Sequence, residues 1–141
     1  MLRRTPNSLA WLALVLASAT SSAAEPAGVT VQLGCRPEAA PGRVLCELQY
    51  RAAAGARLVW ADALVTKTPE FARPLRSRVS PERFSDTAPG ERKLSLGFVA
   101  SQAGVGQVGV RARAVICRGQ GKAETCRPET HDVTAELRVG S

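Results

Sequence analysis

A strict alternation of apolar and polar residues constrains the fold of this chain more than any other feature. In the clearest cases every second side chain is apolar, and the side chains between them are mostly charged or polar. This period of two is typical of a half-buried β-strand, and no segment shows an apolar stripe of helical period. Six segments follow the pattern: 29–35, 43–51, 57–66, 94–98, 108–116 and 133–139.

Turn-forming residues separate these segments. Pro41 and Gly42 lie between the first two, and Pro89 and Gly90 precede the fourth. Residues 67–90 hold four prolines, so we expect a long loop there with one short edge strand. Six or seven strands in a chain of this length predict an antiparallel β-sandwich.

The N-terminal region has the pattern of a secretory signal peptide. Two arginines at positions 3 and 4 are followed by the apolar run 9–17 and then by small residues up to Ala24. The apolar run is too short to span a bilayer as a helix. We therefore expect residues 1–24 to be a signal peptide cleaved near Ala24, which would place the protein in the periplasm or outside the cell.

The remaining residues, 25–141, fit a single domain. Without the two leader arginines the net charge is about +5, which could attract anionic lipids or sugars. The basic segments lack stacking aromatic residues, so a nucleic-acid partner is not expected. No segment of this part is apolar enough to be a transmembrane segment.

Four cysteines lie in this exported part: Cys35, Cys46, Cys117 and Cys126. An even number in a small exported domain indicates two disulfides. Spacings of ten and eight intervening residues, with His131 as the only histidine, do not match a zinc site. We expect no metal and no cofactor.

Two pairings of the cysteines compete. Local pairing would join Cys35 to Cys46 and Cys117 to Cys126, whereas an antibody-like bond would join Cys46 to Cys117 beside Trp60. Cys46 shares the parity of apolar residues in its strand, but Cys117 has the opposite parity from the apolar face of 108–116. An inter-sheet bond would need a bulge near residues 115–116, so parity favours local pairing.

The two local pairs should then differ in role. Cys35 and Cys46 both have inward parity, which predicts a buried structural disulfide. Cys117 has outward parity at the mouth of a glycine-rich hairpin, and an incoming thiolate could reach a disulfide there. The basic residues nearby in sequence, Arg118, Lys122 and Arg127, would stabilise a thiolate. The alternative is a second structural cross-link.

The last third of the chain resembles a known family. The matching segments are 92–96, 108–117 and 126–133, the last reading Cys-Arg-Pro-Glu-Thr-His-Asp-Val. In these segments the chain resembles the periplasmic N-terminal domain of the thiol:disulfide interchange protein DsbD family. Arg127, just after the second cysteine, and the additional pair Cys35 and Cys46 depart from the family's pattern.

The resemblance implies an immunoglobulin-like sandwich of about seven strands in which Cys117 and Cys126 form a redox-active pair. It places Phe84 near an aromatic cap over that pair. It also implies a thioredoxin-like or membrane thiol–disulfide protein as the partner.

Two hypotheses of function follow. In the first, the chain is a thiol–disulfide exchange or acceptor module that works through Cys117 and Cys126, so whether it counts as an enzyme stays open. In the second, it is a non-catalytic binding or structural sandwich with two structural disulfides. A hydrolase is not expected, because the lone His131, taken as a turn residue, has no arrangement of serine or aspartate that would make it a base.

Overall fold

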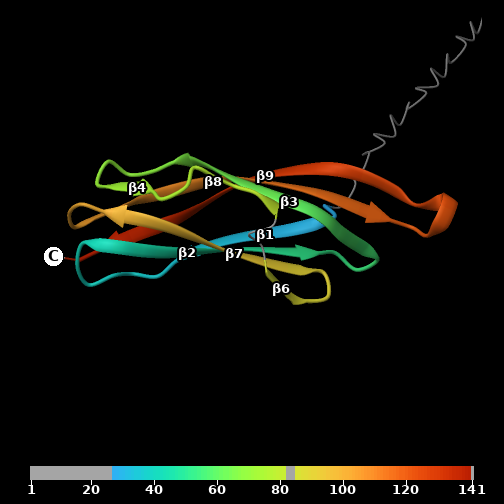
Figure 1. Ribbon diagram of the computed structural model, residues 1–141, viewed down its shortest axis with the longest axis horizontal. Coiled ribbons are helices and arrows are strands. Elements are labelled where there is room, and N and C mark those ends of the chain that lie inside the picture. The colour runs from blue at the N-terminus through green and yellow to red at the C-terminus, as the bar shows by residue number, and fades with distance from the viewer. Residues whose placement is uncertain (1–26, 82–84, 141) are drawn as a thin grey trace, which may run out of the picture.

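The computed structural model describes residues 27–81 and 85–140, and this part of the chain consists almost entirely of β-strands packed as two layers (Figure 1). A single turn of 3₁₀ helix, η2 (Gly121–Ala123), lies between the last two strands. The strands are β1 (Val29–Cys35), β2 (Gly42–Ala52), β3 (Ala56–Lys67), β4 (Ala72–Pro74), β5 (Arg78–Val79), β6 (Ser85–Ala88), β7 (Glu91–Ala100), β8 (Gly104–Arg118) and β9 (Thr125–Val139).

The strand order is that of an immunoglobulin-type sandwich. One sheet has the order β1-β2-β7-β4, with β6 also paired to β7, and the other has the order β5-β3-β8-β9. In immunoglobulin domains the corresponding orders are A-B-E-D and C′-C-F-G. All the pairs are antiparallel. The predicted all-β immunoglobulin-like sandwich is therefore confirmed.

The expectation of a long loop with one short edge strand over residues 67–90 is wrong in detail. This segment contributes three short strands to the described part of the chain, and they alternate between the sheets: β4 and β6 pair with β7, whereas β5 pairs with β3. Each spans two to four residues. Such short pieces carry too few residues for a period of two to be recognised.

The core lies between the two sheets and follows the parity of the sequence. Val44, Cys46, Leu48 and Tyr50 alternate along β2 and are all buried. The apolar residues with even numbers from 108 to 116 do the same along β8. Because every inward position of these two central strands is apolar, slipping either by one residue would expose its whole face.

A β-bulge interrupts β3 where it pairs with β8. Leu58 lies opposite Ile116, but Trp60, two residues further on, lies opposite Val115. The extra residue turns Trp60 onto the outer face of the sheet, where its ring lies 5.6 Å from the guanidinium carbon of Arg113. The bulge is thus in β3, opposite the place in β8 where an antibody-like disulfide would have required one.

The edge strands β1 and β9 run side by side in parallel and close one side of the sandwich. At one end the Gly28 N–H donates to the Glu129 side chain at 2.7 Å. At the other end the Glu38 N–H donates to the carbonyl of Arg138 at 3.0 Å, next to a parallel bridge between Glu38 and Val139. Each strand therefore covers the other's unpaired edge, one way in which proteins protect such edges.

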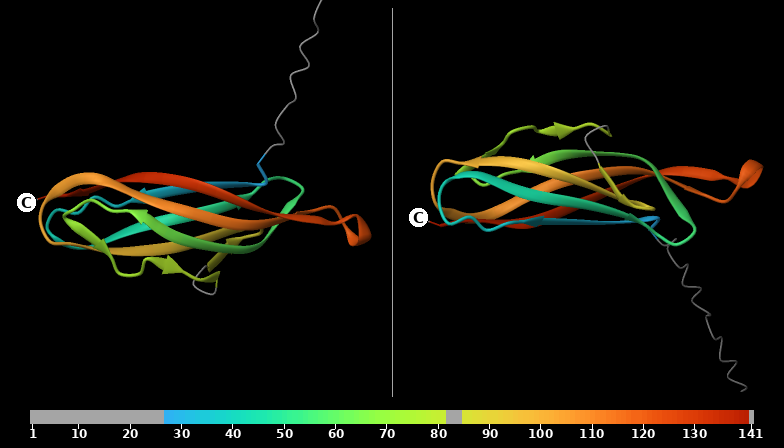
Figure 2. Two further views of the ribbon diagram at one scale, coloured as in Figure 1. Left: turned by 90° about the horizontal axis from the view of Figure 1, so that it is seen from above. Right: turned by 60° about the horizontal axis from the view of Figure 1, so that its bottom comes forward.

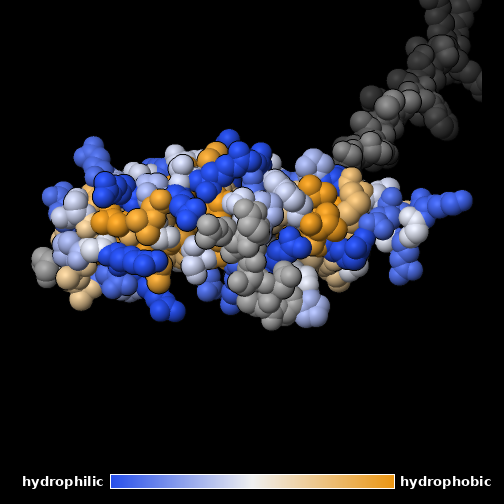
Figure 3. Space-filling model, in the orientation of Figure 1, coloured by the Kyte–Doolittle hydropathy of each residue, from blue (hydrophilic) through white to orange (hydrophobic). Residues whose placement is uncertain are grey.

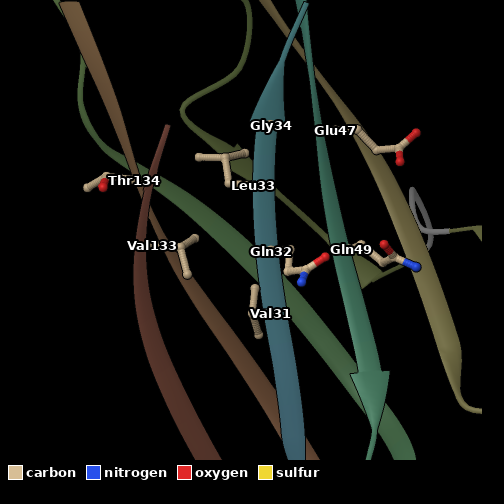
Figure 4. A pocket seen from close by; sticks show the side chains of 8 residues that line it. All are labelled: Val31, Gln32, Leu33, Gly34, Glu47, Gln49, Val133 and Thr134. Atoms are coloured by element: carbon tan, nitrogen blue, oxygen red, sulfur yellow. The ribbon is translucent and has the colours of Figure 1, made fainter. Parts of the chain in front are cut away.

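Between these two contacts the seam leaves a shallow hollow of about 550 Å³ (Figure 4). Val31 and Leu33 of β1 face Val133 of β9 across it, and Gln32 and Gln49 lie on its polar side. The hollow is an open groove along the seam, and its apolar lining consists of side chains of β1 and β9.

The hairpin of β8 and β9 extends beyond the other strands at one end of the molecule (Figure 2). Residues of η2 form its tip. Strands β8 and β9 remain paired over their full lengths, from Gly104 opposite Val139 to Arg118 opposite Thr125. Cys117 and Cys126 lie near the end of this hairpin, where β3 still pairs with β8 through Ala56 and Arg57.

Apolar side chains gather in separate places on the face shown in Figure 3, with charged side chains between them. Large apolar side chains that are exposed come from several strands and loops of the described residues: Leu45, Val59, Leu64, Leu75 and Val105. None of the helices in the described residues is long and apolar enough to cross a bilayer.

Candidate functional site

The structure joins Cys35 to Cys46 and Cys117 to Cys126, which confirms the predicted local pairing. Both pairs are directly opposed residues of antiparallel neighbours. In such a ladder hydrogen-bonded and non-hydrogen-bonded residue pairs alternate, and two further hydrogen bonds show which pairs are which. The Arg36 N–H donates to β2, and the Arg138 carbonyl points away from β8. Both cystines therefore occupy non-hydrogen-bonded positions, where opposed Cα atoms come closest.

The Cys117–Cys126 disulfide belongs to a row of side chains on the outer face of its sheet. Arg57 of β3 lies opposite Cys117 of β8, and Cys117 lies opposite Cys126 of β9. Opposed residues of paired strands share a face. The three side chains therefore stand next to one another across three strands, with the disulfide joining the second and third.

The two halves of this disulfide differ in exposure. Cys117 is only 2% exposed, whereas Cys126 on the edge strand is exposed. The outward parity expected of Cys117 is correct, but of the two sulfurs of the disulfide it is that of Cys126 that is exposed. Parity fixes the face of the sheet but not what covers it, and Cys117 lies in the central strand between Arg57 and Cys126.

A negative charge lies beside the exposed sulfur of the disulfide. Glu124, which directly follows η2, places Oε1 at 3.7 Å from the Cys126 sulfur. The same carboxylate forms an ion pair with Arg57. A disulfide sulfur carries no proton to donate, so the contact of Glu124 with Cys126 is one of proximity rather than a hydrogen bond.

The basic residues expected to stabilise a thiolate do not surround it. Arg118 and Arg127 each adjoin a cysteine in sequence, and successive residues of a strand point to opposite faces. Arg127 lies opposite Ile116, and Arg118 lies opposite Ala56 and Thr125, so both belong to the other face of the arm. Lys122 is exposed in η2. The basic residue next to the disulfide in the sheet is Arg57, which the sequence analysis did not identify.

The Cys35–Cys46 disulfide lies at the edge of the core. Cys46 is 1% exposed, and Cys35 on the edge strand is half-buried. Cys46 shares the inner face of β2 with Val44 and Leu48. A hollow of about 370 Å³ on the outer side of the sheet borders the pair beside Gly34, whose added Cβ would meet no atom within 4 Å. This geometry suits a structural cross-link.

A buried carboxylate that the sequence analysis did not identify lies on the same sheet. Asp62 of β3 is 2% exposed and is ion-paired with Arg113 of β8 and Arg78 of β5. Burial by itself would raise the pKa of Asp62, but the hydrogen bonds and charges of the two arginines outweigh it and lower the pKa. The Tyr50 hydroxyl donates to the Asp62 carbonyl at 2.6 Å.

His131 lies within β9 and not in the expected turn. It is half-buried, and its Nε2 lies 3.1 Å from Glu129 Oε1. Glu129 also accepts the Gly28 N–H, so the pair secures the start of β1. This gives His131 a structural neighbour; the expectation about hydrolase chemistry stays a prediction.

One group of metal-ligand type occurs among residues 27–81 and 85–140: Cys117, Glu124 and Cys126. The two sulfurs are bonded to each other and are therefore not thiolate ligands. Phe84, the candidate cap, lies outside the described residues.

The fold and the site define an immunoglobulin-type sandwich in which each of two antiparallel strand pairs is cross-linked by a disulfide. No protein-family model matches the chain, and no curated protein matches it. Among solved structures, the chain is similar to AggA, the major subunit of aggregative adherence fimbriae type I from Escherichia coli. That match has a TM-score of 0.31 and 12% identity, and it covers 79% of this chain and 95% of the other.

Proposed function

We propose that this chain is an exported, non-catalytic β-sandwich that serves as a binding or structural module, with both disulfides acting as structural cross-links. The observation that carries the proposal is the placement of Cys117. It is buried in a central strand, opposite Arg57, which is ion-paired with Glu124. Exchange chemistry requires an accessible sulfur, and the sulfur of Cys117 is not accessible.

The chemistry at the other sulfur supports the same proposal. An incoming thiolate would have to attack Cys126, which is exposed, and would expel Cys117 as the leaving thiolate. A negative charge on buried Cys117 would lose much of its hydration, which disfavours the charged form. The carboxylate of Glu124 beside Cys126 would also repel the approaching anion.

Export of the module is part of the proposal. Two disulfides in one small domain are typical of oxidising compartments. The expected signal peptide, residues 1–24, lies outside the described residues, so its cleavage near Ala24 stays a prediction. N-terminal sequencing of the protein recovered from the periplasm or medium would test it.

A second candidate function is the thiol–disulfide exchange or acceptor activity that the resemblance to the DsbD family implies. One observation favours it: Cys126 is exposed on a projecting hairpin, where a partner could approach the sulfur. In this candidate the partner would be a thioredoxin-like or membrane thiol–disulfide protein.

A trapping experiment separates the two candidates. The oxidised protein is incubated with a reduced thioredoxin-like protein whose resolving cysteine has been replaced, so that any mixed disulfide persists. We expect no covalent complex within the time in which a known disulfide substrate is fully trapped. A one-to-one complex through Cys126, abolished by Cys126→Ala with Cys117→Ala, would overturn the structural role and support exchange.

A further inference from the structure

The ion pair between Arg57 and Glu124 joins β3 to the end of the β8–β9 hairpin beside the Cys117–Cys126 disulfide. Arg57 reaches from β3, and Glu124 reaches from the turn after η2. Arg57 stands beside Cys117 in the row, and the Glu124 carboxylate stands 3.7 Å from the sulfur of Cys126. The pairing with Arg57 thus holds a negative charge at the exposed end of the disulfide.

The opening of this disulfide by an external thiol has a single accessible route. The thiolate attacks the Cys126 sulfur, a new bond forms between the two sulfurs, and the Cys117–Cys126 bond breaks. The electron pair of the broken bond goes to Cys117, which then takes a proton from water. A second thiol attacks the mixed disulfide and releases Cys126, so the two thiols are oxidised to a disulfide and the protein gains two thiols.

We propose that Glu124, positioned by Arg57, is an electrostatic guard that slows this first attack and selects against anionic thiols. Every attacking thiolate must bring its negative charge to the sulfur that the carboxylate adjoins. A thiol with a second negative charge meets more repulsion, and one with a positive group meets less. The inference rests on the proposed structural role of the disulfide. Glu124 would protect this cross-link by slowing its reduction.

The test uses three small thiols of different charge against the oxidised protein: cysteamine, mercaptoethanol and mercaptoethanesulfonate. The rate of mixed-disulfide formation is measured by quenching and mass spectrometry for the unchanged protein and for Glu124→Gln. Two unit charges about 4 Å apart in water interact enough to change a rate about fivefold. We expect the variant to react about fivefold faster with mercaptoethanol, more than that with the sulfonate and less with cysteamine.

A matched control is Glu136→Gln, which removes an exposed carboxylate paired with Arg138 elsewhere on β9. Its rates should stay within about twofold of the unchanged protein for all three thiols. Thermal melting of each oxidised variant shows whether the substitution destabilises the whole fold.

Equal acceleration of Glu124→Gln by all three thiols, or none, would overturn the proposal, because only a charge effect depends on the charge of the thiol. The proposed function fails on different evidence. The disulfide could exchange at equilibrium with thioredoxin-like proteins while Glu124→Gln still accelerates the three thiols in the expected order. That result would support the electrostatic role of Glu124 and contradict the structural role of the disulfide.

Discussion

The hydroxyl of Tyr50 crosses the core and donates a hydrogen bond of 2.6 Å to the carbonyl oxygen of Asp62 in the opposite sheet. Tyr50 is fully buried, and burial raises its pKa above the ordinary value. Asp62 lies in the regular stretch of β3 that follows the bulge between Leu58 and Trp60. The bond therefore links the inner face of one sheet to a central strand of the other.

Removing this link should destabilise the protein. Tyr50→Phe keeps the ring but leaves the carbonyl of Asp62 without its partner in the core, which should lower the free energy of unfolding by about 1–3 kcal/mol. Urea denaturation followed by fluorescence measures the loss. Thr30→Val, which removes an exposed hydroxyl on β1, is the control and should change stability by less than about 0.5 kcal/mol. Equal effects would show that the inter-sheet bond contributes nothing.

Asp62 should make stability depend on pH in the acid range. The arginines lower its pKa below the ordinary value of 3.8, so its stabilising effect is fully present above about pH 4. The effect is lost as the pH falls through the lower pKa of the folded protein. Asp62→Asn should therefore cost about 1–3 kcal/mol at pH 7 and progressively less below pH 4. A difference in melting temperature that is constant from pH 7 to pH 2 would contradict this.

Two glycines of the β1 region should respond in opposite ways to an added methyl group. A Cβ at Gly28 would lie 2.6 Å from the Glu129 carboxylate and 2.7 Å from Ile116, so Gly28→Ala should disturb the seam and destabilise the fold. At Gly34 an added Cβ meets nothing within 4 Å. Gly34→Ala should be neutral or stabilise by up to about 1 kcal/mol, because it restricts the unfolded chain. Denaturant titration of both variants measures the free energy of unfolding, and equal losses in the two variants would contradict this prediction.

The two disulfides should also differ in what they contribute to stability. Their loops are of similar length, with sequence separations of 11 and 9, so loop closure favours neither by more than a few tenths of a kcal/mol. Cys35→Ala with Cys46→Ala removes atoms from the core, whereas Cys117→Ala with Cys126→Ala acts on the projecting hairpin. We expect the first pair of changes to lower the melting temperature more. The reverse order would show that the Cys117–Cys126 disulfide contributes more to stability than the Cys35–Cys46 disulfide.

Parity in the sequence is sufficient to predict the sandwich, the inner faces of β2 and β8, and the pairing of the cysteines. It could not predict the burial of Cys117, because alternation assigns a residue to a face and is silent about neighbouring strands. Glu124 was missed for a related reason. It lies in a turn, and only the close approach of β3 and the hairpin brings it to Arg57 and Cys126.

The bulge in β3 and the ion pairs of Asp62 could also not be predicted from the sequence. A single extra residue at Val59 reverses the parity of β3 from Trp60 to Val65, and Trp60 then belongs to the outer face. An aspartate between two alanines indicates an exposed position on an ordinary strand. Its burial depends on Arg113 and Arg78, which come from two other strands.

The central claim is that Cys117–Cys126 is a structural cross-link, and its reduction potential tests this most directly. The mature protein is equilibrated in dithiothreitol buffers of graded potential, free thiols are alkylated, and each cysteine is scored by mass spectrometry. We expect both disulfides to stay oxidised down to about −300 mV, below the range of thioredoxin-like proteins. Reduction of Cys117–Cys126 at about −270 mV or above, while Cys35–Cys46 stays intact, would contradict the claim and assign the hairpin to thiol–disulfide exchange.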